Sequence, residues 1–261
     1  MKIFVLLLLS DFLLNQASSQ TTSFYFPSFS SESCNNGSLL CMGAVTAYDG
    51  YLSLSSEPLP GSPNQPVDEV GRVLYHQPVL AWPNITIVSS FTFRISKYPN
   101  STDSGDGMAF IFAPTNDTPS AQSYGSYLGI MDEFTEGEDM HQIAVELDAY
   151  KNDFDLDGNH VAIDIKSVRQ PVALESLNST GVDLKSGRNI TVRIECNGWQ
   201  NLLYVNVHYA DHPPKNVIKQ PINISDIVPS SVYVGFTAAT GAFSESHQLL
   251  EWSLTSLQSV R

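Results

Sequence analysis

The sequence predicts an all-β protein, built as an antiparallel β-sandwich or jelly roll. Short alternating or apolar runs recur along the chain and are bounded by Gly, Pro, Asn, Asp and Ser. Helical periodicity is nearly absent. No linker, composition shift or internal repeat divides the chain, so residues 20–261 are expected to form one domain of two packed sheets.

The individual strands are predicted from the runs with the clearest alternation or the most β-branched and aromatic residues. In chain order these runs are residues 23–27, 72–75, 90–95, 108–112, 144–147, 161–165, 190–194, 202–208, 232–237 and 249–254.

Composition and charge limit the possible partners. Of the 261 residues 42% are hydrophobic and 15% charged, so a sizeable core can form. The formal net charge of −14 disfavours nucleic acid or an anionic membrane as partner. After the N-terminal segment no stretch has the roughly 18 consecutive apolar residues that a membrane span needs.

The N-terminus has the pattern of a secretory signal peptide over residues 1–19. Lys2 supplies the positive charge, residues 3–9 are apolar, and small residues at 17–19 precede Gln20. We therefore expect a secreted, extracellular protein, placed in the apoplast or cell wall if the source is a plant. Seven N-x-[ST] sequons agree with secretion and are expected N-glycosylation sites: Asn36, Asn84, Asn100, Asn116, Asn178, Asn189 and Asn223.

Three cysteines leave one without a partner. Cys34 and Cys41 flank a turn-prone segment, and we expect a local disulfide between them in an oxidising compartment. Cys196 is then expected to be a buried free thiol.

An acidic loop lies between two predicted strands, over residues 146–160. Hard cations bind carboxylate, amide and carbonyl oxygens, and an added imidazole suits a transition ion. The loop therefore predicts a metal site of one or two ions, with a solvated acidic turn as the alternative. Its candidate ligands are Glu146, Asp148, Asn152, Asp153, Asp155, Asp157 and His160.

The residues in and around this loop disfavour two other interpretations, an EF-hand and a glycoside hydrolase site. Asp153-x-Asp155-x-Asp157-Gly158 matches the start of an EF-hand, but an EF-hand needs helices on both sides and both flanks are β-rich. Glu146-Leu147-Asp148 resembles the start of the paired-carboxylate motif of jelly-roll endoglucanases, E-x-D-x-E or E-x-D-x-x-E. The second Glu is missing, because Tyr150 and Lys151 occupy its positions, so a glycoside hydrolase is disfavoured.

The order and combination of several motifs closely resemble the legume (L-type) lectins, over almost the whole mature chain. Besides the acidic loop and the Ile163-Asp-Ile-Lys-Ser-Val168 run that follows it, the matching segments are FYFPSF at 24–29, SGDGMAFIFAP at 104–114, YLG at 127–129, VGFTAATG at 234–241 and LLEWS at 249–253. The resemblance implies a concanavalin-type sandwich that binds sugars and performs no chemistry.

The resemblance also assigns the metal ligands, with Ca²⁺ and Mn²⁺ or another transition ion as cofactors. Glu146, Asp148, Asp155 and His160 would hold the transition ion, with Ser167 supporting it through water. Asp148, the Tyr150 carbonyl, Asn152 and Asp155 would hold Ca²⁺, so that both aspartates bridge the two ions. This division agrees with ligand preference, because the only nitrogen ligand is on the softer ion.

For the sugar site the resemblance implies Asp106, Ser126, Tyr150, Asn152, Ala242 and Phe243. Asp106, which follows a cis peptide bond in the family, would accept hydrogen bonds from two sugar hydroxyls. Three positions depart from the family pattern. Gly105 replaces an Ala, Ser126 stands at the position of a Gly donor, and Phe243 replaces a polar residue.

We therefore expect a secreted, metal-dependent lectin that binds glycans or glycoproteins noncovalently, of the mannose/glucose type, and that can form a homodimer. The alternative is a receptor-type lectin-like domain with a degenerate sugar site, as in the ectodomains of plant lectin receptor kinases.

Overall fold

The computed structural model describes residues 21–58, 65–99 and 101–258. The predicted signal peptide and the sequon at Asn100 lie outside these ranges and stay predictions. No helix in the described ranges is long and apolar enough to cross a membrane.

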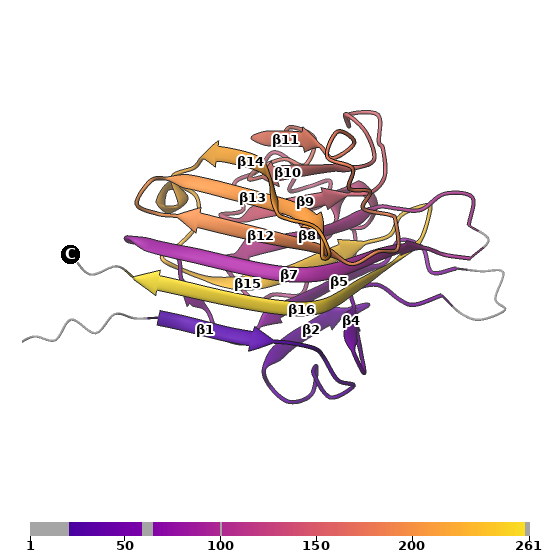
Figure 1. Ribbon diagram of the computed structural model, residues 1–261, viewed down its shortest axis with the longest axis horizontal. Helices are drawn as coiled ribbons and strands as arrows, with labels where there is room; N and C mark the ends of the chain where they lie inside the picture. Colours follow the sequence, from indigo (N-terminus) through magenta and orange to yellow (C-terminus); the bar gives the residue numbers. More distant parts are fainter. Residues whose placement is uncertain (1–20, 59–64, 100, 259–261) are drawn as a thin grey trace, which may run out of the picture.

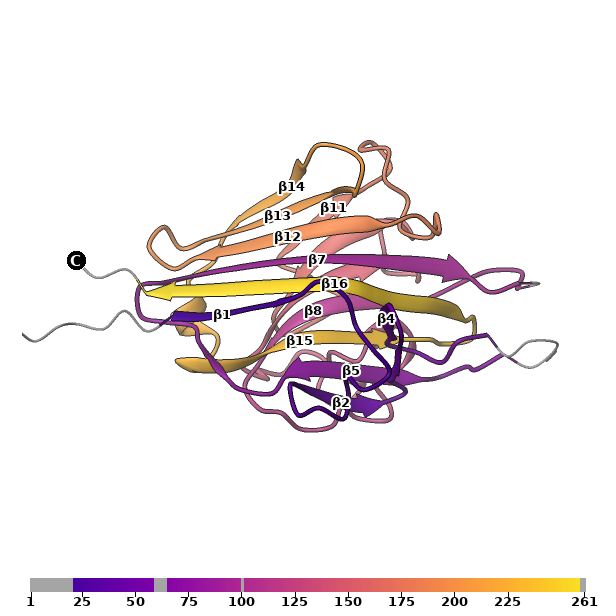
Figure 2. The same cartoon turned by 60° about the horizontal axis from the view of Figure 1, so that its bottom comes forward.

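The described chain folds into two antiparallel sheets, which confirms the predicted fold class. The first sheet has eight strands, and Figures 1 and 2 show most of them side by side in one layer. In spatial order these strands are β14 (Lys215–Pro221), β13 (Leu202–Tyr209), β12 (Ile190–Asn197), β7 (Ile85–Lys97), β16 (Glu245–Gln258), β4 (Tyr51–Ser53) and β3 (Thr46–Tyr48), with β1 (Thr21–Phe26) paired to β16.

The second sheet also has eight strands and lies behind the first in Figure 1. Its order is β11 (Ala173–Ser176), β10 (His160–Asp164), β9 (Ile143–Asp148), β8 (Gly107–Ala113), β15 (Ser231–Ala239), β5 (Val70–Tyr75) and β2 (Leu39–Gly43), with β6 (Val79–Leu80) paired to β15. Two short 3-10 helices, η1 (Gly125–Tyr127) and η2 (Ile224–Asp226), lie in connecting loops.

Every run that the sequence predicts to be a strand lies in one, to within a residue at each end. The strands that the sequence missed are β2, β3, β4, β6, β11 and β14. Five of them have five residues or fewer, which is too short for a clear alternation, and β6 has only two residues. The sixth, β14, is an edge strand whose charged and amide side chains hide the pattern, since only one of its seven residues is buried.

The main core fills the space between the two sheets. Residues of β7 alternate between buried and partly exposed along the strand, as expected when one face of a sheet packs inward. Phe236 on β15 contacts three aromatic rings, with centroids 4.7 Å from Phe91, 5.4 Å from Phe110 and 5.0 Å from Trp252. The Trp252 indole also donates a hydrogen bond to the Ser89 hydroxyl. This aromatic cluster therefore joins the two sheets.

A second hydrophobic cluster covers the outer face of the second sheet. Ala109, Ile111 and Ala144 point away from the main core, and the segment that contains Leu128 and Ile130 packs on them. As a result, every residue of β8, β9 and β10 is buried. Polar side chains on this outer face are thus withdrawn from water, and the acidic residues of β9 and β10 are among them.

The cysteine predictions are confirmed. Cys34 and Cys41 form a disulfide, and Cys196 is a buried free thiol whose pKa burial raises to about 12. The side chains of the six described sequon asparagines, at positions 36, 84, 116, 178, 189 and 223, are exposed. This exposure is compatible with glycosylation at these positions.

Replacing Phe236 with Ala should lower the free energy of unfolding by about 3–5 kcal/mol, because it leaves a cavity among the three rings. Urea unfolding followed by tryptophan fluorescence measures the change. Phe134→Ala is the matched control, since 76% of the Phe134 side chain is exposed and its loss should change stability by less than about 0.5 kcal/mol. Equal losses in the two variants would contradict the placement of the core.

Candidate metal and carbohydrate site

Neighbouring antiparallel strands bring three metal-ligand candidates together. In the register of β9 and β10, His160 lies opposite Asp148, and Ala162 lies opposite Glu146. Side chains alternate along a strand, so Glu146, Asp148 and His160 all point to the outer face of the second sheet. One potential ligand atom of each lies within 4.8 Å of the others, and all three side chains are buried.

The loop between β9 and β10 is folded by its own carboxylates. Asp148 Oδ1 accepts a hydrogen bond from the Tyr150 backbone N–H at 2.8 Å, and Asp155 Oδ2 accepts one from the Asn152 N–H at 2.7 Å. Such side-chain-to-backbone bonds fix tight turns. Strands rather than helices flank the loop, so the EF-hand interpretation is excluded.

A separate carboxylate holds the end of the loop. Asp157 accepts hydrogen bonds from the Asn159 N–H and from the side chains of Ser176 and Asn178. Its oxygens are therefore engaged in fixing the loop to β11 and the segment after it. Asp155 makes no such contact with another strand, which favours Asp155 over Asp157 as a ligand.

Several donor atoms of the loop are left available for a cation. Nδ1 of His160 lies 2.7 Å from the Asp157 carbonyl oxygen and can donate to it, which leaves Nε2 with a free lone pair. Oδ1 of Asn152 is buried and accepts no hydrogen bond. A buried acceptor without a donor costs free energy unless a ligand satisfies it. The donor set therefore fits a metal ion with oxygen and imidazole ligands.

The electrostatics of the site are those of crowded carboxylates. Burial first, and then neighbouring carboxylates, raise the pKa of Glu146 and of Asp148 well above the ordinary range. The pKa of Asp155, which is half-buried, is also raised, and burial is again the main cause. Each of these groups would be more easily ionised if a cation were bound among them.

Asp164 is a member of this cluster that the sequence did not identify as a site residue. It is fully buried, neither of its carboxylate oxygens accepts a hydrogen bond from a donor group, and burial raises its pKa to about 8. Glu146 is its close neighbour, and a hydrogen bond between these two carboxyls requires a shared proton. The alternation His160, Ala162, Asp164 is the sequence signal that could have found it.

Ser167 is placed against a carboxylate outside the β9–β10 loop. Its hydroxyl donates to Glu136, and its oxygen accepts hydrogen bonds from the backbone N–H groups of Arg169 and Gln170. The predicted water-mediated role of Ser167 stays a prediction, because its described contacts serve to hold the turn after β10.

All six residues predicted for the sugar site line one cavity of about 440 Å³. They come from four loops that are far apart in the sequence. The cavity also includes Asp68, Tyr124, Gly125, Tyr127 and Gly241, which the sequence had not assigned to the site. Tyr150 and Asn152 belong both to this cavity and to the acidic loop, so the candidate metal and sugar sites share a wall.

Asp106 lies at the base of this cavity and is 5% exposed. Its N–H donates to the Ala239 carbonyl, and its own carbonyl accepts from the Ala149 N–H, so its backbone is tied to both β15 and the end of β9. The Gly105–Asp106 peptide bond is cis, as the resemblance implied. Burial raises the pKa of Asp106 to about 7, and the charges of Glu245, Asp68 and Asp155 act in the same direction.

Two glycines allow close contacts around Asp106. A Cβ atom on Gly241 would lie 2.6 Å from Asp106 Oδ2, so a side chain at position 241 would collide with the carboxylate. A Cβ on Gly105 would lie 2.7 Å from Tyr150 Cβ and 3.0 Å from its Cγ. The space of the Ala that is usual at position 105 is therefore taken here by the base of the Tyr150 side chain.

Ser126 and Phe243, the other two residues that depart from the family pattern, lie in two loops that line the cavity. Gly125 adopts a positive φ of 63°, which a glycine accommodates most easily, and Ser126 follows it in the turn of η1. The Phe243 ring lies 5.6 Å from the Tyr150 ring between centroids, at an interplanar angle of 39°. The two rings form one side of the cavity, and Phe243 does not fill it.

An all-β sandwich whose acidic, cation-compatible loop adjoins a polar cavity with aromatic walls defines a carbohydrate-binding protein of the lectin class. The chain belongs to the legume lectin family, because the legume lectin domain matches residues 21–261. This confirms the resemblance seen in the sequence.

Relatives of known description agree with this assignment. A lectin of Pisum sativum is 32% identical, with 97% of this chain and 90% of that protein covered. Truncated lectin 2 of Medicago truncatula is 31% identical, with 94% and 86% covered. A probable L-type lectin-domain containing receptor kinase of Arabidopsis thaliana, S.5, is 32% identical, with 80% of this chain but only 32% of that protein covered.

Solved structures show the same fold. Peanut lectin with a nine-residue peptide superposes with a TM-score of 0.78 at 28% identity, covering 92% of this chain and 100% of that chain. The metal-free form of lectin I-B4 from Griffonia simplicifolia also gives 0.78 at 28% identity, covering 90% and 99%. The relatives matched over most of their own length are lectins, which bind carbohydrate without enzymatic chemistry.

Without bound metal, this carboxylate cluster should make the protein less stable as the pH rises from about 4 to about 8. A carboxyl whose pKa is raised by folding holds its proton more tightly in the folded chain, so ionising it favours unfolding. Melting temperatures measured in EDTA between pH 5 and pH 8 test this.

The Glu146→Gln variant removes one carboxyl from the cluster and should flatten this pH dependence. Glu175→Gln, at an exposed position of β11, removes the same charge outside the cluster and should leave the pH dependence as in the parent protein. If both variants have the same slope as the parent, the carboxylate cluster is not its source.

Proposed function

We propose that this protein is a metal-dependent lectin that binds glycans noncovalently. The observation that carries the proposal is the convergence of Asp106, Ser126, Tyr150, Asn152, Ala242 and Phe243 on one cavity beside the acidic loop. Family membership supports the same conclusion at the level of carbohydrate binding.

Two ions would share the acidic loop. Glu146, Asp148, Asp155 and His160 would hold a transition ion such as Mn²⁺, and Asp148, the Tyr150 carbonyl, Asn152 and Asp155 would hold Ca²⁺. The unpartnered Asn152 oxygen and the free Nε2 of His160 support this division. When bound, the ions would neutralise the negative charge of the buried carboxylates.

This chain's own residues would bind the sugar. The Asp106 carboxylate has acceptor capacity for two adjacent hydroxyls, and the Asn152 side-chain amide can donate while its oxygen faces the cation site. Tyr150 and Phe243 offer aromatic faces to the apolar side of a pyranose ring. The backbone at Ser126 and Ala242 would complete the donors around the ring.

Sugars of the mannose/glucose type are the proposed ligands, because the loop between β15 and β16, residues 240–244, is short, as the resemblance implies for binders of this type. Single-site affinity would be weak, and useful binding would come from several sites acting together. A homodimer would provide such multivalency. In the described chain β1 pairs only with β16, so its other edge is open to a second copy.

Secretion and N-glycosylation belong to the same proposal. Exposed sequon asparagines and the Cys34–Cys41 disulfide support an extracellular location. The domain would begin at Gln20, after removal of residues 1–19.

A receptor-type lectin-like domain with a degenerate sugar site is the alternative, and the Arabidopsis receptor kinase relative favours it. This alternative depends on Ser126 and Phe243, the two cavity residues that differ from the family pattern. A glycan array probed with the metal-loaded protein, with and without EDTA, separates the two. Binding lost in EDTA supports the lectin, and no binding by a folded, metal-loaded sample supports the degenerate site.

Replacing Asp106 with Ala should abolish sugar binding and leave the metal content unchanged. Two hydrogen bonds to a charged acceptor would be lost, which lowers affinity by at least about 100-fold. Isothermal titration with methyl α-mannoside measures the affinity, and elemental analysis measures the metals. Retained sugar binding would show that Asp106 has been assigned the wrong role.

Replacing Asp155 with Ala should release both ions, because one carboxylate would bridge them. Elemental analysis after dialysis against metal-free buffer measures the content, and we expect a loss of affinity of at least about 10-fold for each metal. Asp153→Ala is the control two residues away, since Asp153 is exposed and is not a proposed ligand. Loss of only one ion from the Asp155 variant would refute the bridging role.

A further inference from the structure

Arg72 on β5 is a buried cation outside the candidate metal and sugar sites. Its side chain is only 9% exposed and points to the outer face of the second sheet, as Leu74 does. No carboxylate in the described ranges forms an ion pair with it. Burial lowers the pKa of Arg72 to about 10, while the nearby charge of Asp117 acts in the opposite direction, so the guanidinium stays charged at neutral pH. A buried charge without a counter-ion depends on its hydrogen bonds.

Those hydrogen bonds go to two backbone carbonyls of one segment. Nη2 of Arg72 donates to the Gly129 carbonyl at 2.7 Å, and Nη1 donates to the Asp117 carbonyl at 3.2 Å. The planar fork of a guanidinium can serve two acceptors at once, which the single nitrogen of a lysine does less well. Arg72 therefore holds both ends of the segment from Asp117 to Gly129 against β5.

This segment carries one wall of the candidate sugar cavity, because residues 124–127 line that cavity. The Gly129 N–H donates to the Ser123 carbonyl at 2.7 Å, and the Leu128 N–H donates to the Gly125 carbonyl at 3.0 Å. These bonds connect the residue that Arg72 holds to the turn that faces the sugar. A displacement of Gly129 would therefore displace residues 124–127 as well.

Gly129 approaches the sheet closely enough for the guanidinium to reach its carbonyl. It adopts a positive φ of 73°, and a Cβ atom at this position would lie 2.9 Å from Thr237 Cβ and 3.1 Å from Val70 Cγ1. Thr237 is the partner of Arg72 in the register of β15 and β5. The contact between Arg72 and Gly129 is thus built into the pairing of these two strands.

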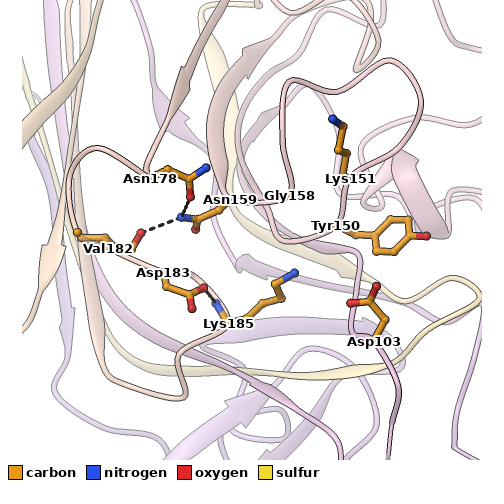
Figure 3. A pocket seen from close by; sticks show the side chains of 10 residues that line it. Asp103, Tyr150, Lys151, Gly158, Asn159, Asn178, Val182, Asp183 and Lys185 are labelled. Carbon is orange, nitrogen blue, oxygen red and sulfur yellow. Dashed lines mark hydrogen bonds between the residues drawn. The ribbon is translucent and has the colours of Figure 1, made fainter.

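Another wall of the cavity, the β9–β10 loop, has anchors of its own. Figure 3 shows the Asn159 side-chain amide donating to the Val182 carbonyl, and the Asn159 oxygen accepts a hydrogen bond from the Leu184 N–H. The hydrogen bonds of Arg72 go to the other wall. Loss of Arg72 should therefore move residues 124–127 and leave the candidate metal ligands in place.

We propose that Arg72 is a positioning residue for sugar binding, whose buried guanidinium holds residues 117–129 so that residues 124–127 line the sugar cavity. This assignment rests on the proposed lectin function. Arg72 does not touch the sugar. It acts through the backbone at Gly129, so its loss weakens sugar binding while the metal content stays unchanged.

The test is isothermal titration of metal-loaded protein with methyl α-mannoside, or with the sugar that the glycan array selects. Arg72→Met removes the donors and keeps most of the side-chain volume, and it should lower the affinity at least about tenfold. Arg72→Lys keeps the charge but can serve the two carbonyls less well, so an intermediate loss of about threefold is expected. Elemental analysis should find the parent's metal content in both variants.

Gln142→Leu is the matched control for a general loss of stability. Gln142 is 6% exposed, and its amide donates to the Ile130 carbonyl at 2.9 Å, just beyond the residues that line the cavity. This variant should lower the melting temperature but leave the sugar affinity within about twofold of the parent value. Hydrogen exchange followed by mass spectrometry should show faster exchange of residues 123–129 in Arg72→Met and parent-like exchange there in Gln142→Leu.

Chemical rescue tests the role of the guanidinium itself. A cavity of about 220 Å³ is lined by Arg72, Asp117 and Gly129 among others, so Arg72→Ala leaves room for a small cation. Added methylguanidinium should restore the sugar affinity of Arg72→Ala to within about threefold of the parent value, and methylammonium, which lacks the planar fork, should restore less. If Arg72→Met does not fold, Arg72→Lys and this rescue carry the test.

Each outcome decides. An unchanged affinity in Arg72→Met overturns the positioning role and leaves the lectin proposal standing. Equal losses of affinity in Arg72→Met and Gln142→Leu, or a loss of metal along with the sugar, also overturn it. A folded, metal-loaded parent protein that binds no glycan overturns the lectin function and the role of Arg72 in it together.

Discussion

The acidic cluster between β9 and β10 is the constraint on which the rest of this structure depends. Glu146, Asp148 and Asp164 are buried, and no Lys or Arg in the described chain forms an ion pair with them. Ionised carboxylates in such a place repel one another unless a cation or shared protons neutralise them. The raised pKa values of these three carboxyls follow from this arrangement.

Burial of this cluster is a consequence of the fold. The hydrophobic segment around Leu128 and Ile130 covers the outer face of the second sheet and so removes water from β9 and β10. The same sheet carries Asp106, whose carbonyl accepts a hydrogen bond from the Ala149 N–H at the end of β9. This hydrogen bond links the candidate sugar carboxylate to the candidate cation loop, so a displacement of one backbone segment would displace the other.

Most of the longer strands and the candidate cation ligands could be predicted from the sequence, because strand periodicity and the spacing of the acidic loop are local signals. The short and edge strands could not be predicted, since pairing at a sheet edge depends on partners far away in the chain. Strand alternation could have placed Asp164 on the same face as His160, but its burial depends on the distant segment that covers this face. The contact between Gly105 and Tyr150 could not be foreseen either. A glycine in the sequence does not say which atoms occupy the space of its missing side chain, and here they come from residue 150.

The two kinds of site differ in how they are assembled. The candidate cation ligands span only residues 146–160, whereas the cavity beside them also draws on residues 68, 106, 124–127 and 241–243. Residues 124–127 and 241–243 contain no proposed cation ligand. Mutations there would change the lining of the cavity and leave every proposed cation ligand in place. The proposed sugar recognition is therefore free to diversify over evolutionary time while the candidate cation loop stays constant.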